Sequence, residues 1–580
     1  MRKTRWLGLF ALESRPLTIL YWAAVGLVVG GFFATRLLPC VDYPQHLGLS
    51  DLARRLQDAS APEQAHYELD YFTYNGLFHL VVGTLSTFVP IELAGRVVVA
   101  GSLLATSAGV VALLRALRRP AWHATLFTPI LFSFSLGWGF VNYVLATAIA
   151  VWALVFVARA ADPLLAPSAR NLIAIGSLGL ICAFAHVLAM LVLCVAAAVV
   201  ASEVAWRESA TADANAPRAT IPRRLYRTAV RTTHVLLPLV VGCAFCIAVY
   251  HRQYAWNPDV YRDSTLEGTA PPLWEKLVYF SAFATDLYSD ASDQLFLWAS
   301  IAIIACVALA AAVRVSRRRD EERRLSSEPS AASNDAPRGT APLLGLFLAM
   351  AIAYFATPMV LIGTHLIFPR LAQWLMLGAV VAMPSPSPSP SPSPSPSPSP
   401  RWAGRVQYAA AVLGLVAGAN AFAHCAFFGR ETRDASAMLD DLPPGRAATA
   451  VIWDPWTESF RNGTLTHLAA YYAARKHGTW AFSFARYLSV PVRFKPGATP
   501  PWPARGWEFS AEDYDARCKY ARAFPLVIVK TPDDLPTDAG SEPRVRSLVF
   551  REDANAVRLL SHHGAYWAFD SAGLPEDGTL

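Results

Sequence analysis

Apolar runs of about 20 residues, separated by short polar segments, constrain this chain more than any other feature. A helix that crosses a bilayer needs about 20 predominantly apolar residues. The runs lie at 17–39, 95–117, 121–136, 138–159, 171–185, 187–205, 234–251, 294–314, 342–362, 365–383 and 406–428. Charged residues make up only 16% of the 580 residues, whereas a soluble domain has about 25%. The sequence therefore predicts a polytopic α-helical membrane protein with about 11 transmembrane helices.

The distribution of basic residues predicts how the helices are oriented. Segments on the N-terminal side of the membrane carry about three times as many Lys and Arg residues as those on the other side, counted up to residue 429. The positive-inside rule therefore places the N-terminus in the cytoplasm. An odd number of spans then places the C-terminal segment outside it. The excess of Arg over Lys and a Pro-Ser repeat suggest a GC-rich bacterial gene, so we expect a bacterial inner (plasma) membrane and a periplasmic C-terminal segment.

Composition divides the chain into a transmembrane domain, 1–429, and a periplasmic domain, 430–580. The second has a balanced set of charges, strand-like runs at 450–453 and 524–529, and a helical pattern near 465–475. We expect a small α/β domain there. Two cytoplasmic loops, 315–341 and 384–405, are expected to be disordered, since the first is charged and Ser-rich and the second contains the Pro-Ser repeat.

The first loop beyond the N-terminal span, 40–76, carries candidate catalytic groups. Asp42 and His46 stand at the start of an amphipathic helical pattern, and Pro44 suits a helix's first turn. Such a helix is expected to lie flat on the membrane, which would hold Asp42 and His46 near the lipid–water boundary. Two readings stay open for Asp42. It either takes part in catalysis or only neutralises the N-terminal end of the helix.

A second candidate group is the turn between two spans at 364–370, which contains His365 and Arg370. An Arg at the head of an apolar span is costly unless it reaches the interface or meets an anion. Its planar fork of donors suits a phosphate. The alternative is that Arg370 extends to the lipid headgroups.

The layout resembles the GT-C superfamily of glycosyltransferases, which take sugars from polyprenyl-phosphate carriers. The resemblance rests on a first span followed by the loop 42–46, a span that ends at 113–119, a tight hairpin at 137–143, a short pair with His186 at its tip, and a soluble domain after the last span. It implies that Asp42 is the base that activates the acceptor, with His46 sharing or orienting that role. It also implies that Arg370, with His365, binds the donor phosphate.

The same resemblance implies the partners of the protein. These are membrane lipid, a polyprenyl-phosphate sugar as donor, and a glycan, lipid or protein as acceptor. No cofactor beyond the lipid-linked donor is expected. The hairpin 137–143 contains no carboxylate, whereas metal-using members carry an acidic pair in an early loop, so a metal-independent reaction is favoured. The first loop also has Asp42-Tyr43 where many relatives have Asp-Glu, and this weakens the assignment of Asp42.

Two other functions fit the sequence. A transporter or flippase would place charges or broken helices at the bilayer midplane, often in repeated halves. A non-catalytic scaffold would use only its C-terminal domain to bind a partner. Nucleic-acid binding is not expected, because the basic residues lie at span ends and not along one face.

Overall fold

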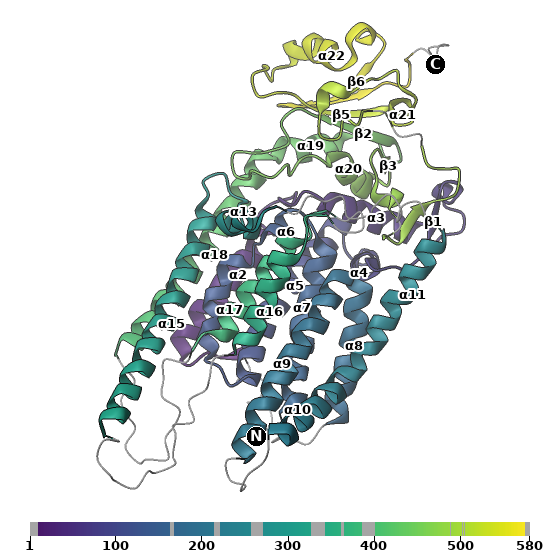
Figure 1. The fold of residues 1–580 in the computed structure, drawn as a ribbon. Coiled ribbons are helices and arrows are strands. Elements are labelled where there is room, and N and C mark those ends of the chain that lie inside the picture. Colours follow the sequence, from purple (N-terminus) through teal and green to yellow (C-terminus); the bar gives the residue numbers. More distant parts are fainter. Residues whose placement is uncertain are drawn as a thin grey trace.

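The computed structural model describes residues 10–162, 168–213, 221–256, 271–325, 343–360, 365–384, 401–487, 489–500, 503 and 505–574. It has two parts, a bundle of long helices and a mixed α/β region that covers one end of the bundle (Figure 1). The chain enters the bundle through α2 (Arg15–Gly31), which begins at the uncovered end. It leaves through α18 (Arg401–Glu431), which ends beside the α/β region (Figure 1).

Six helical stretches among the described residues are long and apolar enough to cross a membrane. They are formed by α5 (Ile91–Ala116), α7 (Val141–Ala161), α9 (Val187–Asp213), α10 (Ile221–Leu236) with α11 (Val240–Trp256), α15 (Ser292–Leu325) and α18. Shorter apolar helices complete the bundle: α2, α4 (Gly76–Leu85), α8 (Ala169–Ala185), α16 (Leu344–Ala356) and α17 (Ala372–Ala382). All the predicted runs except 121–136 overlap one of these helices, and α4 was not predicted.

The outer surface of the bundle is apolar. Large side chains such as Ile173, Ile247, Leu309 and Ile352 are more than half exposed. An exposed apolar surface of this extent is unfavourable in water and is typical of a membrane-facing surface. The chain is therefore a multi-pass helical membrane protein.

Residues 121–136 are not a transmembrane α-helix, contrary to the prediction. They form a 3₁₀-helix, Ala121–Ile130, and the short α6 (Phe134–Gly137). Pro129 lies inside the 3₁₀-helix and cannot donate to an α-helical ladder. Every residue of Ala121–Ile130 is buried, and the segment packs among α5, α15, α17 and α18. A segment buried on all sides has the same apolar composition as a membrane span, which explains the error.

The two loops predicted to be disordered are partly helical. α15 continues to Leu325, so residues 315–325 extend a helix, and residues 401–405 form the first turn of α18. The residues at 317–325 are mostly Arg and Glu, which are good helix formers and continue a helix already nucleated in the bundle. The remainder, 326–341 and 385–400, lies outside the described residues.

The α/β region contains a five-stranded mixed sheet in the order β3-β2-β5-β7-β6. The strands are β2 (Ala447–Ile452), β3 (Thr479–Trp480), β5 (Leu526–Lys530), β6 (Arg558–His563) and β7 (Tyr566–Asp570). β2 runs parallel to β3 and β5, whereas β7 runs antiparallel to β5 and β6. Around the sheet lie α19 (Arg433–Asp441), α20 (Leu468–Lys476), α21 (Lys519–Arg522) and α22 (Glu542–Phe550). The predicted strands at 450–453 and 524–529 and the helix near 465–475 correspond to β2, β5 and α20.

The first loop, 40–76, pairs with and packs against the α/β region. Its strand β1 (Tyr67–Leu69) pairs antiparallel with β4 (Val492–Phe494), and its helix α3 (Tyr43–Arg55) packs against α20. α3 starts next to Pro44, as predicted, but it does not lie on an open membrane surface. All of its residues from Tyr43 to Ala53 are buried, because the α/β region covers the face that was expected to contact water.

Asp51 shows how the polar face of α3 is stabilised when it is covered. Its carboxylate is 1% exposed and accepts from Arg54 and Arg55, each at 2.9 Å, while His477 of the α/β region lies 3.1 Å away. Burial alone would raise the pKa of Asp51, but the hydrogen bond from His477 and the two Arg charges outweigh it and lower the pKa. Asp51 and Arg55 therefore join α3 to the α/β region, through His477 and the carbonyl oxygen of Gly478.

Candidate functional site

Asp42 is held at the start of α3 by its backbone, not by a helix cap. Its side chain makes no capping hydrogen bond. The amide of Asp42 donates to the carbonyl oxygen of Trp138 at 3.0 Å, and the amide of Val41 donates to that of Gly137 at 2.9 Å. Gly139 has φ +81°, and a Cβ there would lie 2.6 Å from the amide nitrogen of Asp42. Only glycine fits this approach, so the hairpin 137–143 fixes the backbone of Asp42 and leaves its carboxylate free.

The carboxylate of Asp42 faces a histidine of the α/β region. His467 Nε2 lies 3.3 Å from Asp42 Oδ1, and His467 Nδ1 lies 3.2 Å from Glu508 Oε1. Burial disfavours the charged imidazole, but the hydrogen bonds and charges of Asp42 and Glu508 prevail and raise the pKa of His467 to about 9. This raised pKa favours the charged imidazole at neutral pH, with one ring nitrogen facing each carboxylate.

Gln45 ties this contact to the sheet. Its side-chain oxygen accepts from Trp480 Nε1 at 2.7 Å, and its nitrogen donates to the carbonyl oxygen of Phe482 at 3.1 Å. The Gln45 side chain is buried one helical turn from Asp42. The position of α3 relative to His467 thus depends on the hydrogen bonds that Gln45 makes with the α/β region.

His46 lies near the same charges but is neutral. Burial lowers its pKa to about 4, the nearby Asp42 carboxylate opposes this shift, and the positive charges of His467 and Arg370 add to it. The charges of Asp42, His467 and Arg370 are therefore all close enough to His46 to change its pKa. The sequence named three of them, Asp42, His46 and Arg370, from segments more than 300 residues apart.

Arg370 lies in the 3₁₀ turn Phe368–Leu371 before α17, where Tyr143 of α7 donates to its carbonyl oxygen at 2.7 Å. Its guanidinium carbon lies 3.7 Å from the centre of the Phe140 ring. It donates to the carbonyl oxygens of Leu366 and His365 at 3.2 and 3.1 Å, and its Nη1 lies 3.2 Å from His186 Nε2.

Arg370 is only 6% exposed, yet it forms no ion pair with any residue that the structure describes. A buried cation normally has an anionic partner. The guanidinium retains N–H groups that the carbonyl oxygens do not occupy, since it has five donors. It is therefore suited to bind an anion that is brought by another molecule.

His365 is placed differently from the prediction that its side chain binds phosphate. Its carbonyl oxygen accepts from Arg370, while the residue itself is exposed. The neighbouring positions 361–364 are outside the described residues. The structure thus shows a backbone contact that orients Arg370, and the role of the imidazole stays a prediction.

Sequence reasoning missed His467 and Glu508, the two residues that the α/β region contributes. Neither lies in a recognisable motif, and the pairing of His467 with Asp42 depends on how α20 packs against α3. Phe140 and His186 stood in segments that the sequence singled out as hairpins. The ring of Phe140 and the imidazole of His186 lie at turns at the ends of helices, and a buried Arg can contact both kinds of group.

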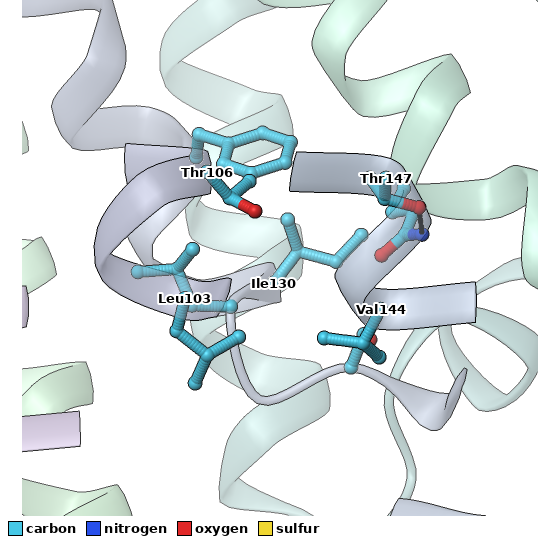
Figure 2. A pocket seen from close by; sticks show the side chains of 9 residues that line it. Leu103, Thr106, Ile130, Val144 and Thr147 are labelled. Carbon is cyan, nitrogen blue, oxygen red and sulfur yellow. Dashed lines mark hydrogen bonds between the residues drawn. The ribbon is translucent and has the colours of Figure 1, made fainter. Parts of the chain in front are cut away.

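Among the cavities formed by the described residues are two small ones, each with room for about one water molecule. One lies between α5, α7 and α17 and is lined by Leu103, Thr106, Phe127, Ile130, Leu131, Ser133, Val144, Thr147 and Gln373 (Figure 2). There Gln373 donates to Thr147 Oγ1 at 3.1 Å. The other adjoins His467, Glu508 and Gln45. Within the described ranges, no three His, Cys, Asp or Glu residues are placed to hold a metal ion.

The fold and site define a multi-pass helical membrane protein whose α/β region meets the bundle at a cluster of buried charged and imidazole side chains. No family model matches the sequence, and no curated protein matches it. The fold is similar to the crystal structure of ArnT from Cupriavidus metallidurans bound to undecaprenyl phosphate, with 12% identity, a TM-score of 0.45, and coverage of 97% of this chain and 100% of that chain. The apo state of ArnT gives 13% identity, a TM-score of 0.45, and coverage of 96% and 99%. This identity is too low to transfer a residue's role.

The pairing of His467 predicts how the site responds to pH. A pKa raised from 6.5 to about 9 means that the stability contributed by the charged His467 is fully present below pH 6.5 and is lost as pH rises through about 9. We expect thermal stability and activity to fall on this alkaline limb. In Glu508→Gln the limb should move to lower pH by about one unit, because one of two negative partners is removed.

The measurement is the pH dependence of the unfolding temperature, taken from pH 6 to 10 for the parent and Glu508→Gln. Glu552→Gln is a matched control, since Glu552 is an exposed acid of the same α/β region. An alkaline limb that stays at the same pH in Glu508→Gln would show that Glu508 does not hold the charge on His467.

Proposed function

We propose that this chain is a membrane glycosyltransferase that moves a sugar from a polyprenyl-phosphate donor to an acceptor beyond the bundle, on the side of the α/β region. The observation that carries the proposal is Arg370. It is a buried guanidinium without an ion-pair partner in the described chain, and it lies near enough to the carboxyl group of Asp42 for the two to interact electrostatically. A cation for a leaving phosphate and a base for an attacking hydroxyl are the two groups that such a transfer needs.

The reaction follows from these two groups. The acceptor's hydroxyl oxygen attacks the anomeric carbon of the sugar, and the hydroxyl proton passes to the Asp42 carboxylate. The bond between the anomeric carbon and the phosphate oxygen breaks, and its electron pair leaves with the phosphate. Arg370 stabilises the charge that develops on that oxygen. His467 Nε2, 3.3 Å from Asp42 Oδ1, holds the carboxyl group in position for the incoming hydroxyl.

The location of the site suits a lipid-linked donor. Arg370 lies at the head of an apolar helix, α17, while Asp42 lies beneath the α/β region. A lipid phosphate at the membrane surface would reach Arg370 with its chain in the bilayer, and an acceptor could approach Asp42 from the covered end. The basic clusters of the sequence place this end outside the cytoplasm, which in a bacterial inner membrane is the periplasm. The acceptor class stays a glycan, a lipid or a protein.

The test uses the full-length protein in liposomes with polyprenyl monophosphates that carry a radiolabelled pentose or hexose. A mixture of envelope glycolipids, glycans and proteins supplies acceptors. We expect the label to move to one acceptor class with release of polyprenyl phosphate in equal amount. A second arm follows a fluorescent lipid-linked sugar across the bilayer. Translocation without cleavage of the sugar–phosphate bond would replace the proposal with the flippase reading.

A further inference from the structure

His46 is surrounded by three buried polar side chains that the reaction described so far does not use. They are Ser50 of α3, His79 of α4 and Asn142 of α7, each at most 2% exposed. His46 Nδ1 lies 3.3 Å from His79 Nε2 and 3.3 Å from the side-chain nitrogen of Asn142. His79 Nδ1 lies 3.1 Å from the Ser50 hydroxyl. Side chains of two other helices, α4 and α7, thus meet at one nitrogen of His46.

The single hydrogen of the Ser50 hydroxyl determines which ring nitrogen carries the hydrogen in His79 and in His46. That hydroxyl donates to the carbonyl oxygen of His46 at 2.8 Å, one turn earlier in α3. It can therefore only accept from His79, so His79 carries its hydrogen on Nδ1. A neutral imidazole with a hydrogen on Nδ1 has its lone pair on Nε2. His79 Nε2 must then accept from His46, which places the hydrogen of His46 on Nδ1.

Asn142 fits this arrangement when its amide is turned over. Its oxygen is buried without a partner, while its nitrogen faces His46 Nδ1, which is itself a donor. The oxygen and nitrogen of a side-chain amide are distinguished by their hydrogen bonds. Exchanging them gives the oxygen a donor and removes the contact between two donors, while the amide nitrogen takes the position that has no partner among the described residues. Asn142 then becomes a second acceptor for the same His46 hydrogen.

With its hydrogen fixed on Nδ1, His46 has a lone pair on Nε2. That nitrogen makes no hydrogen bond within the part of the chain that the structure describes. We propose that Ser50, His79 and Asn142 are positioning residues that fix this tautomer, so that His46 Nε2 accepts a hydrogen bond from a second hydroxyl group of the bound substrates, while the attacking hydroxyl donates its only hydrogen to Asp42. The proposal rests on the proposed sugar transfer. It adds His46 Nε2 to Asp42 as a second group that contacts the substrates.

A purely structural role for these residues predicts something different. Buried imidazoles would then matter only for packing, and any replacement of similar size would change stability without changing the chemical step. A positioning role requires an acceptor at the place of His79 Nε2. Replacement by Gln keeps an acceptor oxygen within reach, whereas replacement by Leu fills the space without one. These two variants therefore separate the readings.

We expect His79→Leu to lower kcat by about 10- to 100-fold, as removal of an outer hydrogen-bond partner of a functional histidine does. The KM for the lipid-linked donor should change little, because Arg370 is untouched. His79→Gln should retain most of the kcat. His123→Leu is the matched control, since His123 is a fully buried histidine of the 3₁₀-helix Ala121–Ile130, and it should not lower kcat. Equal kcat for parent and His79→Leu would overturn the proposal.

A spectroscopic measurement tests the tautomer without relying on activity. ¹⁵N-histidine solid-state NMR of the full chain in lipid, with His46→Gln to assign the signal, distinguishes a hydrogen on Nδ1 from one on Nε2. We expect His46 to carry it on Nδ1 in the parent and to lose this preference in His79→Leu. A hydrogen on Nε2 in the parent would overturn this inference whatever the reaction is. Failure of the transfer assay with the Nδ1 tautomer present would instead remove the proposed function, and with it the use of His46 Nε2.

Discussion

Asp42→Asn should lower the rate of sugar transfer by about 10²- to 10⁴-fold, the range for loss of a general base. Asn has nearly the same shape as Asp and can still accept a hydrogen bond from His467 through its oxygen. It cannot take up the hydroxyl proton. His467 also keeps its second partner, Glu508, at 3.2 Å. The variant should therefore fold in the membrane and fail in the chemical step.

The measurement is the initial rate of transfer together with the unfolding temperature of the purified variant. Asp58→Asn is the matched control, because Asp58 lies in the same loop, is exposed, and its carboxylate hydrogen-bonds only with Ser60 among the described residues. It should transfer sugar at the parental rate. If Asp42→Asn did so too, Asp42 would not be the base, and the role of the Asp42–His467 pair would be structural.

The helices of the bundle could be predicted because their signal is local. A run of about 20 apolar residues is needed wherever a helix crosses lipid, so α5, α7 and α18 are visible in the sequence without knowledge of their neighbours. The start of α3 was visible for the same reason, since Pro44 marks a first turn. The prediction of a transmembrane helix at Ala121–Ile130 was wrong because burial in protein and burial in lipid both favour apolar residues.

The site could be predicted only in part. Asp42 and Arg370 attracted notice as charged groups beside apolar spans, where an isolated charge is costly. His467 and Glu508 lie in a region of ordinary composition, and nothing near them in the sequence indicates that they face Asp42. Their role depends on packing between α3 and α20, which is a contact between segments more than 400 residues apart. Such a contact leaves no periodic pattern in one sequence.

Arg370→Gln should weaken binding of the lipid-linked donor by at least about a hundredfold. Each hydrogen bond to a charged group contributes about 1.5–3 kcal/mol, and about 1.4 kcal/mol corresponds to a factor of ten in affinity. Two such bonds to a phosphate account for that loss. The substitution should not unfold the protein, because Arg370 has no carboxylate partner among the described residues that would be left buried and unpaired.

Arg370→Lys separates charge from geometry. Lys keeps the positive charge but lacks the planar fork and the flat surface that lies 3.7 Å from the Phe140 ring centre. We expect it to restore only part of the donor affinity. Arg430→Gln is the matched control, because Arg430 also lies over a phenylalanine ring, Phe427 at 5.0 Å, but is exposed at the end of α18.

Donor affinity is measured by titrating short-chain polyprenyl phosphate into each variant in detergent, with the unfolding temperature as the control for folding. The sign of the effect on stability is itself informative. A buried cation without an anionic partner is unfavourable in the free protein, so Arg370→Gln should be as stable as the parent or more stable when no lipid phosphate is present. Unfolding of this variant, with donor binding intact in Arg370→Lys, would mean that the guanidinium serves to hold the carbonyl groups of His365 and Leu366 and does not bind the phosphate.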